Sequence, residues 1–250
     1  MRFRQLCIAA LMAASTFACG AKRRPAKGAL PPLTASSWLI GLPNAESGEA
    51  KVAVPLGAVK ARPLLIALHG EVDRPEWQCG SYRGITHGRS FILCPSGPAR
   101  AALGGVRAPV ADTARELRAE IAALKAKFGA HLARGSVVLA ALGPTVEQAL
   151  TIALEEPSFF SRLVLVNGSL SRLDAAFATR YGQLGGERVL VVCSRGACDA
   201  DADTRARSLR PSGVEVHFVV PERGEGLDGE IARVIEEQWP WLVGSDSRWR

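Results

Sequence analysis

The stretch VVLAALGPT, residues 137–145, decides the fold class of this chain. Its first six residues, Val137–Leu142, form an unbroken apolar run, which is typical of a strand covered on both faces of a sheet. Gly143 then permits a sharp turn, and Pro144 suits the first turn of a helix, which the pattern continues over residues 144–155. A buried strand that leads directly into a helix predicts a parallel sheet with helices on both of its faces.

The same alternation of short apolar runs and helical patterns extends along the chain in both directions. Strands are predicted at residues 38–42, 51–55, 64–68, 91–94, 137–142, 163–166, 189–193 and 214–220, with the first two as an antiparallel hairpin. Helices are predicted at residues 112–128, 144–155, 172–181, 204–209 and 229–239. The sequence therefore predicts a single α/β domain, built on a doubly wound, mostly parallel sheet of about eight strands.

The N-terminus has the pattern of an export signal. Two arginines precede an apolar run over residues 6–17, which is too short to span a bilayer stably. The sequence TFACG, residues 16–20, then resembles a bacterial lipobox, in which the cysteine, here Cys19, becomes the lipidated first residue of the mature chain. It departs from the usual pattern at Thr16, so ordinary signal-peptidase cleavage stays an alternative.

These features divide the chain into four parts. We expect a signal peptide at 1–18, a disordered tether at 19–36, the folded α/β domain at 37–244 and a short tail at 245–250. They predict an exported lipoprotein of a bacterial cell envelope, in the periplasm or at the outer membrane, that meets the membrane through its lipid anchor. The net charge of +7 is scattered and aromatic residues make up only 6%, so we do not expect a nucleic-acid partner.

The cysteine count favours the lipoprotein. Once one cysteine leaves with the signal and Cys19 is lipidated, four remain, and an even set in an oxidising compartment predicts two disulfides. Three pairings are open, and the local pairs Cys79–Cys94 and Cys193–Cys198 are favoured because each brackets one connection. Neither pair has the Cys-x₂-Cys spacing of a zinc site, so no metal and no cofactor is predicted.

The order of elements resembles the α/β-hydrolase superfamily, and in particular its small lidless esterases and dienelactone hydrolases. The resemblance covers residues 38–243 and rests on two antiparallel strands, the β–α alternation and a final helix. The stretch PLLIALHG, residues 63–70, resembles the third strand of that family running into its His-Gly turn, here His69 and Gly70. The resemblance implies that the backbone N–H just beyond this turn helps to form an oxyanion hole.

The resemblance fails where the catalytic residues should stand. In that family a Gly-x-Ser-x-Gly turn after the fifth strand exposes the nucleophilic serine, and Gly143 occupies this position here. Pro144 follows and has no N–H, which removes the second oxyanion donor. The loop that holds the family's histidine base has Glu225 instead. Asp199 lies near the position of the family's acid, although a helix cap is its favoured role.

The sequence therefore predicts a pseudo-hydrolase that lacks the catalytic serine and histidine and binds an unidentified small molecule or an envelope partner. Two alternatives stay open. One is an active carboxylic-ester hydrolase with a relocated nucleophile, such as Ser169 or Ser96. The other is a thiol-dependent enzyme that uses Cys193 or Cys198.

Overall fold

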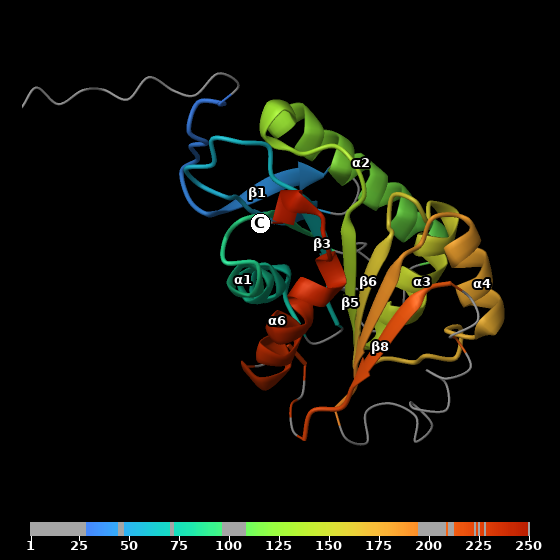
Figure 1. Cartoon of the computed structure of the whole chain (residues 1–250). Coiled ribbons are helices and arrows are strands. Elements are labelled where there is room, and N and C mark those ends of the chain that lie inside the picture. The colour runs from blue at the N-terminus through green and yellow to red at the C-terminus, as the bar shows by residue number, and fades with distance from the viewer. Residues whose placement is uncertain are drawn as a thin grey trace, which may run out of the picture.

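The computed structural model describes residues 29–44, 48–70, 73–96, 109–194, 209, 213–222, 224, 226–227 and 229–249. Its strands form one sheet in the order β1-β2-β4-β3-β5-β6-β7-β8 (Figure 1). The strands are β1 Leu39–Asn44, β2 Gly48–Ala53, β3 Leu64–Leu68, β4 Phe91–Cys94, β5 Val138–Leu142, β6 Arg162–Val166, β7 Arg188–Val192 and β8 Glu215–Val219. Strand β2 is antiparallel to β1 and β4, and every other neighbouring pair is parallel. The predicted eight-stranded, mostly parallel sheet is confirmed.

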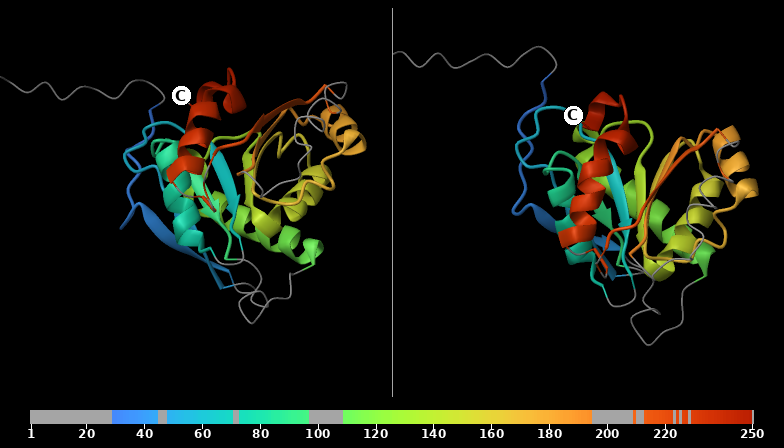
Figure 2. Two further views of the ribbon diagram at one scale, coloured as in Figure 1. Left: turned by 90° about the horizontal axis from the view of Figure 1, so that it is seen from below. Right: turned by 60° about the horizontal axis from the view of Figure 1, so that its bottom comes forward.

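Helices cover both faces of this sheet (Figure 2). One face carries α1 and α6, and the other carries α2, α3 and α4. The helices are α1 Pro75–Ile85, α2 Val110–Phe128, α3 Val146–Glu155, α4 Ala175–Gln183 and α6 Gly229–Val243. Side chains alternate along β3, so that Leu65 and Ala67 pack towards α1 and α6 while Ile66 and Leu68 pack towards the opposite layer. Both faces are covered, which explains why β3, β5 and β6 are buried along their whole length.

Three helices differ most from the prediction, whereas α2 and α3 differ by two residues at their first ends. Helix α1 was not predicted, because its buried face holds only Gln78, Cys79, Tyr82 and Ile85 and two glycines interrupt the pattern. Helix α4 begins three residues later than expected, where the Asp174 carboxylate accepts a hydrogen bond of 2.7 Å from the Phe177 N–H. Helix α6 continues through Pro240 to Val243. Of the predicted helix at 204–209, only Leu209 lies within the described residues.

Both ends of the described chain pack more closely than expected. Leu33, placed in the disordered tether, is only 7% exposed and exchanges backbone hydrogen bonds with Gly57 and Ala58. Trp249, placed in the tail, is also 7% exposed and meets the Trp239 ring edge-on at 5.2 Å. Both side chains are apolar and gain stability from burial. Their burial was not predicted, because polar and turn-forming residues surround them in the sequence. Residues 19–28 of the tether lie outside the described part.

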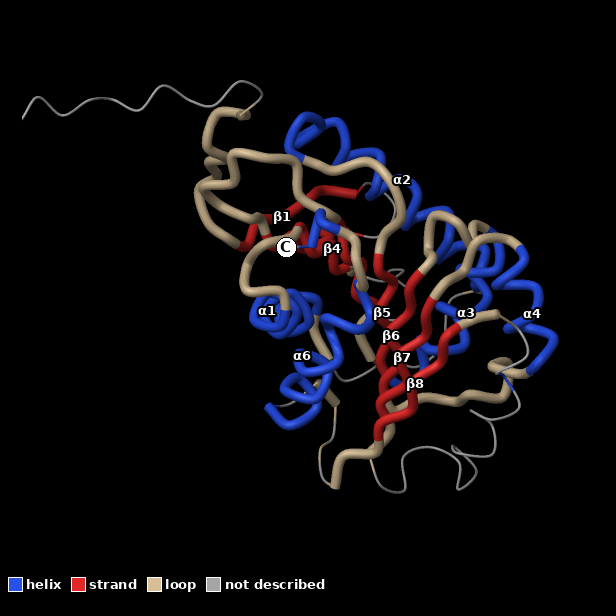
Figure 3. The backbone as a smooth tube through the Cα atoms, in the orientation of Figure 1, coloured by secondary structure: helices blue, strands red, loops and turns tan. Residues whose placement is uncertain are grey.

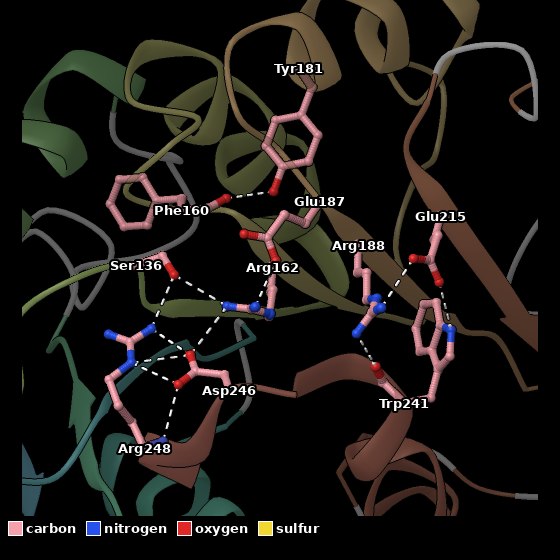
Figure 4. A network of polar contacts seen from close by, with 10 residues as sticks. All are labelled: Ser136, Phe160, Arg162, Tyr181, Glu187, Arg188, Glu215, Trp241, Asp246 and Arg248. Carbon is pink, nitrogen blue, oxygen red and sulfur yellow. Dashed lines mark hydrogen bonds and ion pairs between the residues drawn. The ribbon is translucent and has the colours of Figure 1, made fainter. Parts of the chain in front are cut away.

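Arginines hold the C-terminal segment to the amino ends of the parallel strands (Figure 4). Arg162 at the start of β6 pairs with Glu187 at 2.6 Å and lies 3.6 Å from Asp246. Arg248 binds the Asp246 carboxylate at 2.5 Å and donates to the Ser136 hydroxyl at 3.2 Å.

Within the described residues, no helix has both the length and the apolar character that a membrane span requires.

Candidate functional site at the carboxyl ends of the strands

The two motifs that carried the family resemblance follow β3 and β5, which are parallel neighbours, so both lie at the carboxyl edge of the sheet. Figure 3 shows β5, β6, β7 and β8 side by side in this sheet. Strand β5 ends at Leu142, and the single 3-10 turn Gly143–Thr145 leads directly into α3. Gly143 has φ +60°, a conformation that glycine adopts without the cost borne by other residues. A methyl group on Gly70, which follows β3, would lie 3.6 Å from the carbonyl oxygen of Leu142. Gly143 and Gly70 are therefore placed as the sequence predicted, and we refer to residues 142–145 as the elbow.

Among the described residues, a Cβ atom at the elbow position 143 would meet no close neighbour. Its nearest contact in that part of the chain would be Asn167 O, at 3.9 Å. By contrast, a Cβ atom on Gly168 would overlap the Gly143 carbonyl oxygen and the Val146 side chain. The loop after β6 thus contacts the elbow closely at Gly168, whereas no described residue lies closer than 3.9 Å to a Cβ atom at position 143.

Thr145 stands where the motif has its last glycine, and its hydroxyl is used by the backbone. The Oγ1 atom accepts a hydrogen bond from the Leu142 N–H at 3.1 Å. It lies 2.9 Å from the Leu142 carbonyl oxygen and 3.2 Å from that of Leu68, and its single proton can be donated to one of these at a time. The side chain joins the ends of β3 and β5 and does not offer a free nucleophile.

His69 serves as a link between two loops. Its Nδ1 lies 2.8 Å from the Gly70 carbonyl oxygen, and its Nε2 lies 3.3 Å from the Ser96 carbonyl oxygen. Carbonyl oxygens only accept hydrogen bonds, and a neutral imidazole donates from one nitrogen, so the ring donates to one of these oxygens at a time. His69 contacts the backbone of Ser96, which gives no support to a Ser96–His69 pair of nucleophile and base.

The other histidines are engaged elsewhere. His131 contacts the Pro31 carbonyl oxygen at 2.9 Å, and His87 contacts the Glu236 carboxylate at 3.3 Å. His217 stacks on Trp241 with ring centroids 3.7 Å apart. None of these contacts brings an imidazole to the elbow.

Ser169 lies beside the elbow, directly after Gly168, and its partner is a carboxylate. Its hydroxyl donates to Glu147 Oε1 at 2.8 Å, and the Ser171 hydroxyl donates to the same oxygen at 2.9 Å. Glu147 stands in the first turn of α3. A carboxylate matches the general-base role at neutral pH less well than an imidazole does. Ser169 has the place of a relocated nucleophile, and its candidate base Glu147 suits that role less well than an imidazole.

Asn167 is the residue of this site that the sequence reasoning missed. It has φ +46°, and its side-chain oxygen accepts hydrogen bonds from the Ser194 N–H at 2.7 Å and the Ser194 hydroxyl at 2.9 Å. These bonds fasten the ends of β6 and β7. The Asn-Gly pair directly after a buried strand is the signal that could have indicated it. Asp199 and Glu225 lie outside the described residues, so their roles stay predictions.

The cysteines of the described chain are paired. Cys79 of α1 and Cys94 at the end of β4 form a disulfide with Cα atoms 5.9 Å apart, which confirms that predicted pair. Cys193 is also disulfide-bonded, whereas Cys198 lies outside the described residues, so their pairing stays a prediction. The described residues contain no group of three or more His, Cys, Asp or Glu side chains arranged to hold a metal ion.

Comparisons with known proteins agree on the fold. No protein-family model matches this chain, and no curated protein matches it. The solved structure of MPT51 (FbpC1) from Mycobacterium tuberculosis is 17% identical, with a TM-score of 0.59 over 82% of this chain and 97% of its own. Fluorophosphonate-binding serine hydrolase F from Staphylococcus aureus is 11% identical, with a TM-score of 0.56 over 83% and 98% of the two chains.

A dienelactone hydrolase from Anabaena variabilis is 12% identical, with a TM-score of 0.56 over 82% of this chain and 95% of its own. Each of these structures matches almost its full length to this chain. At such low identities the likeness shows the fold and says nothing of individual catalytic residues. The protein has the α/β-hydrolase fold.

Proposed function

We propose that this protein is an exported, lipid-anchored pseudo-hydrolase that uses the α/β-hydrolase fold to bind a ligand and has no serine-hydrolase activity. One observation carries the proposal. The elbow is the place where the fold exposes its nucleophile. Here it holds Gly143, in a left-handed conformation, with Pro144 as the next residue.

Two parts of the catalytic machinery are missing together. Gly143 supplies no oxygen to attack an ester carbonyl. Pro144 has no N–H to stabilise the oxyanion that such an attack produces, and the loss of one oxyanion donor lowers the rate by about 10²–10³. The hydroxyl group of the elbow belongs to Thr145 and is hydrogen-bonded to the backbone. Binding without turnover is the role that this combination supports.

The site of binding in this proposal is the carboxyl edge of the sheet, where open α/β sheets hold their ligands. Among the described residues, Gly143 leaves room for a ligand, and the polar pair of Ser169 and Glu147 beside it offers hydrogen-bonding groups. The ligand is a small molecule or a group on an envelope partner.

A specific contact favours one rival, an ester hydrolase with Ser169 as nucleophile and Glu147 as its base, 2.8 Å apart. The thiol-dependent alternative loses Cys193, because a disulfide-bonded sulfur has no thiolate to attack with.

The decisive experiment exposes the purified mature protein to a fluorophosphonate probe and to a short-chain aryl ester. We expect neither labelling nor turnover, with the fluorophosphonate-binding hydrolase of Staphylococcus aureus as the positive control. Labelling that disappears in Ser169→Ala would overturn the proposal and establish the relocated nucleophile.

A second test of the same proposal adds the missing catalytic groups one at a time. Gly143→Ser alone should give no activity, because a serine hydroxyl needs an adjacent base to take its proton. Adding Glu225→His supplies a candidate base. Adding Pro144→Gln then supplies the backbone N–H that Pro144 lacks. We expect traces of esterase activity at most before the third change, and activity in the first variant would count against the proposal.

A further inference from the structure

Three segments gather where the described chain begins, at residues 29–38, 54–63 and 121–137. The Leu30 N–H donates to the Val59 carbonyl at 2.8 Å, and the His131 ring lies 2.9 Å from the Pro31 carbonyl oxygen. The Arg62 N–H donates to the His131 carbonyl at 2.7 Å. Figure 1 shows these segments together at the upper left, at the end of the sheet opposite to the elbow. We call their combined surface the acid-free face.

The name reflects the composition of the three segments, which contain no Asp or Glu. They hold five Lys and Arg residues, namely Lys60, Arg62, Lys125, Lys127 and Arg134. The ammonium groups of Lys125 and Lys127 lie 5.5 and 5.8 Å from the ring centroids of Phe159 and Phe128. Three carboxylates near its border are bound by arginines: Glu155 and Glu156 by Arg118, and Asp246 by Arg248. The face is therefore positively charged and close to apolar surface.

Apolar groups accompany this charge. Leu56 and Val59, in the turn between β2 and β3, are 47% and 40% exposed. A pocket of about 620 Å³ opens within the face, and its lining combines Lys125 and Arg134 with the apolar side chains of Leu132 and Phe159. No carboxylate contributes to this lining. Exposed cations beside apolar side chains suit a surface with anionic groups above a hydrocarbon layer.

The length of chain before the described residues brings the face close to such a surface. Nine residues lie between Cys19 and Ala29, and the ten steps from one to the other, at about 3.3–3.6 Å each, reach at most ~35 Å. Four of these residues, Lys22, Arg23, Arg24 and Lys27, are also basic, and none is acidic. A lipid on Cys19 would thus hold the acid-free face within a short distance of the bilayer.

We propose that the acid-free face docks on anionic lipid headgroups of the membrane that carries the anchor. The proposal rests on the lipid anchor at Cys19 and goes beyond it, because it assigns the domain a fixed orientation. With this face on the membrane, the elbow at the opposite end of the sheet points into the aqueous space.

The test uses the full lipidated protein on vesicles of phosphatidylcholine, with and without phosphatidylglycerol. An environment-sensitive fluorophore is attached at Ala130→Cys, an exposed position within the face. Ala176→Cys on α4, also exposed and far from the face, is the matched control. We expect a blue shift of emission at position 130 only, on anionic vesicles only, and its loss at high salt because screening weakens attraction between exposed charges.

Charge reversal distinguishes docking from mere proximity. Lys60→Glu, Lys125→Glu and Lys127→Glu together should abolish the shift while the circular dichroism spectrum is retained, because all three side chains are exposed. No shift at position 130, or an equal shift at both positions or in both lipids, would overturn the proposal. Flotation with neutral vesicles reports on the anchor separately, so a failed anchor and a failed docking face give different results.

Discussion

At the scale of single residues, Gly143 in the elbow and Gly168 in the loop beside it are required for different reasons. Gly143 has a left-handed backbone and no close neighbour among the described residues, whereas Gly168 has no room for a side chain. We expect Gly143→Ala to cost about 1–2 kcal/mol, the usual penalty of an alanine in that conformation. Gly168→Ala should cost more, because its methyl group would overlap the Gly143 carbonyl and displace the elbow.

Urea unfolding of the two variants beside the parent protein measures this difference. The two substitutions add the same methyl group to neighbouring loops, so each is the other's control. Equal losses of unfolding free energy, or a greater loss at position 143, would show that Gly168 does not pack tightly against the elbow.

At the scale of elements, the disulfide between Cys79 and Cys94 fastens α1 to the end of β4. It closes a loop of 15 residues, for which the chain-entropy model gives a stabilisation of about 3 kcal/mol. We expect the double variant Cys79→Ser and Cys94→Ser to lose about that much free energy of unfolding. Reductant should lower the stability of the parent far more than that of the variant, and an unchanged urea midpoint in the variant would contradict the role of the bridge.

The ion pairs of Asp246 hold the C-terminal segment in place. We therefore predict that the free energy of unfolding decreases in acid, as this carboxylate is protonated. The hydrogen bond from Arg248, with further charge from Arg162, holds the pKa of the Asp246 carboxyl below its ordinary value. A lowered folded-state pKa gives a stabilisation that is complete above the unfolded-state pKa and is lost as the pH falls through the folded-state pKa.

We therefore expect Asp246→Asn to cost roughly 1–3 kcal/mol at neutral pH and to flatten the decline of stability in acid. Asp112→Asn is the control, since its pair with Arg115 is exposed and should contribute about 0–1 kcal/mol. Urea midpoints measured from neutral pH downward check both variants. Parallel curves for Asp246→Asn and the parent would contradict the assignment.

Elements with a clear apolar pattern were predictable, and those that depend on tertiary contacts were not. Strands β3 and β4 have the predicted bounds because unbroken apolar runs end at polar or turn residues. Helix α1 escaped prediction because its buried side includes Gln78 and Cys79, which gain their place from the sheet and the disulfide. At the site, Gly143 and Gly70 followed from strand order, whereas Asn167 depends on where Ser194 lies in space.

At the scale of the whole molecule, the fold separates the proposed ligand site from the proposed membrane contact. The parallel strands carry the elbow at their carboxyl ends, and the segment that begins at Ala29 packs near their amino ends (Figures 1 and 2). A ligand in the aqueous space would reach the elbow of an anchored molecule without passing between the domain and the bilayer.

The last prediction concerns the anchor itself. Cys19→Ser removes the only sulfur in the lipobox-like sequence, so the protein should leave the membrane fraction after a high-salt wash, which also disrupts charge contacts of the acid-free face. Cys7→Ser, within the signal and outside that sequence, is the matched control and should leave fractionation unchanged. The thermal midpoint of the domain should be unaffected, because its core is built from residues after Ala29. Retention of the Cys19→Ser protein in washed membranes, with gel mobility equal to that of the parent, would contradict the lipid anchor.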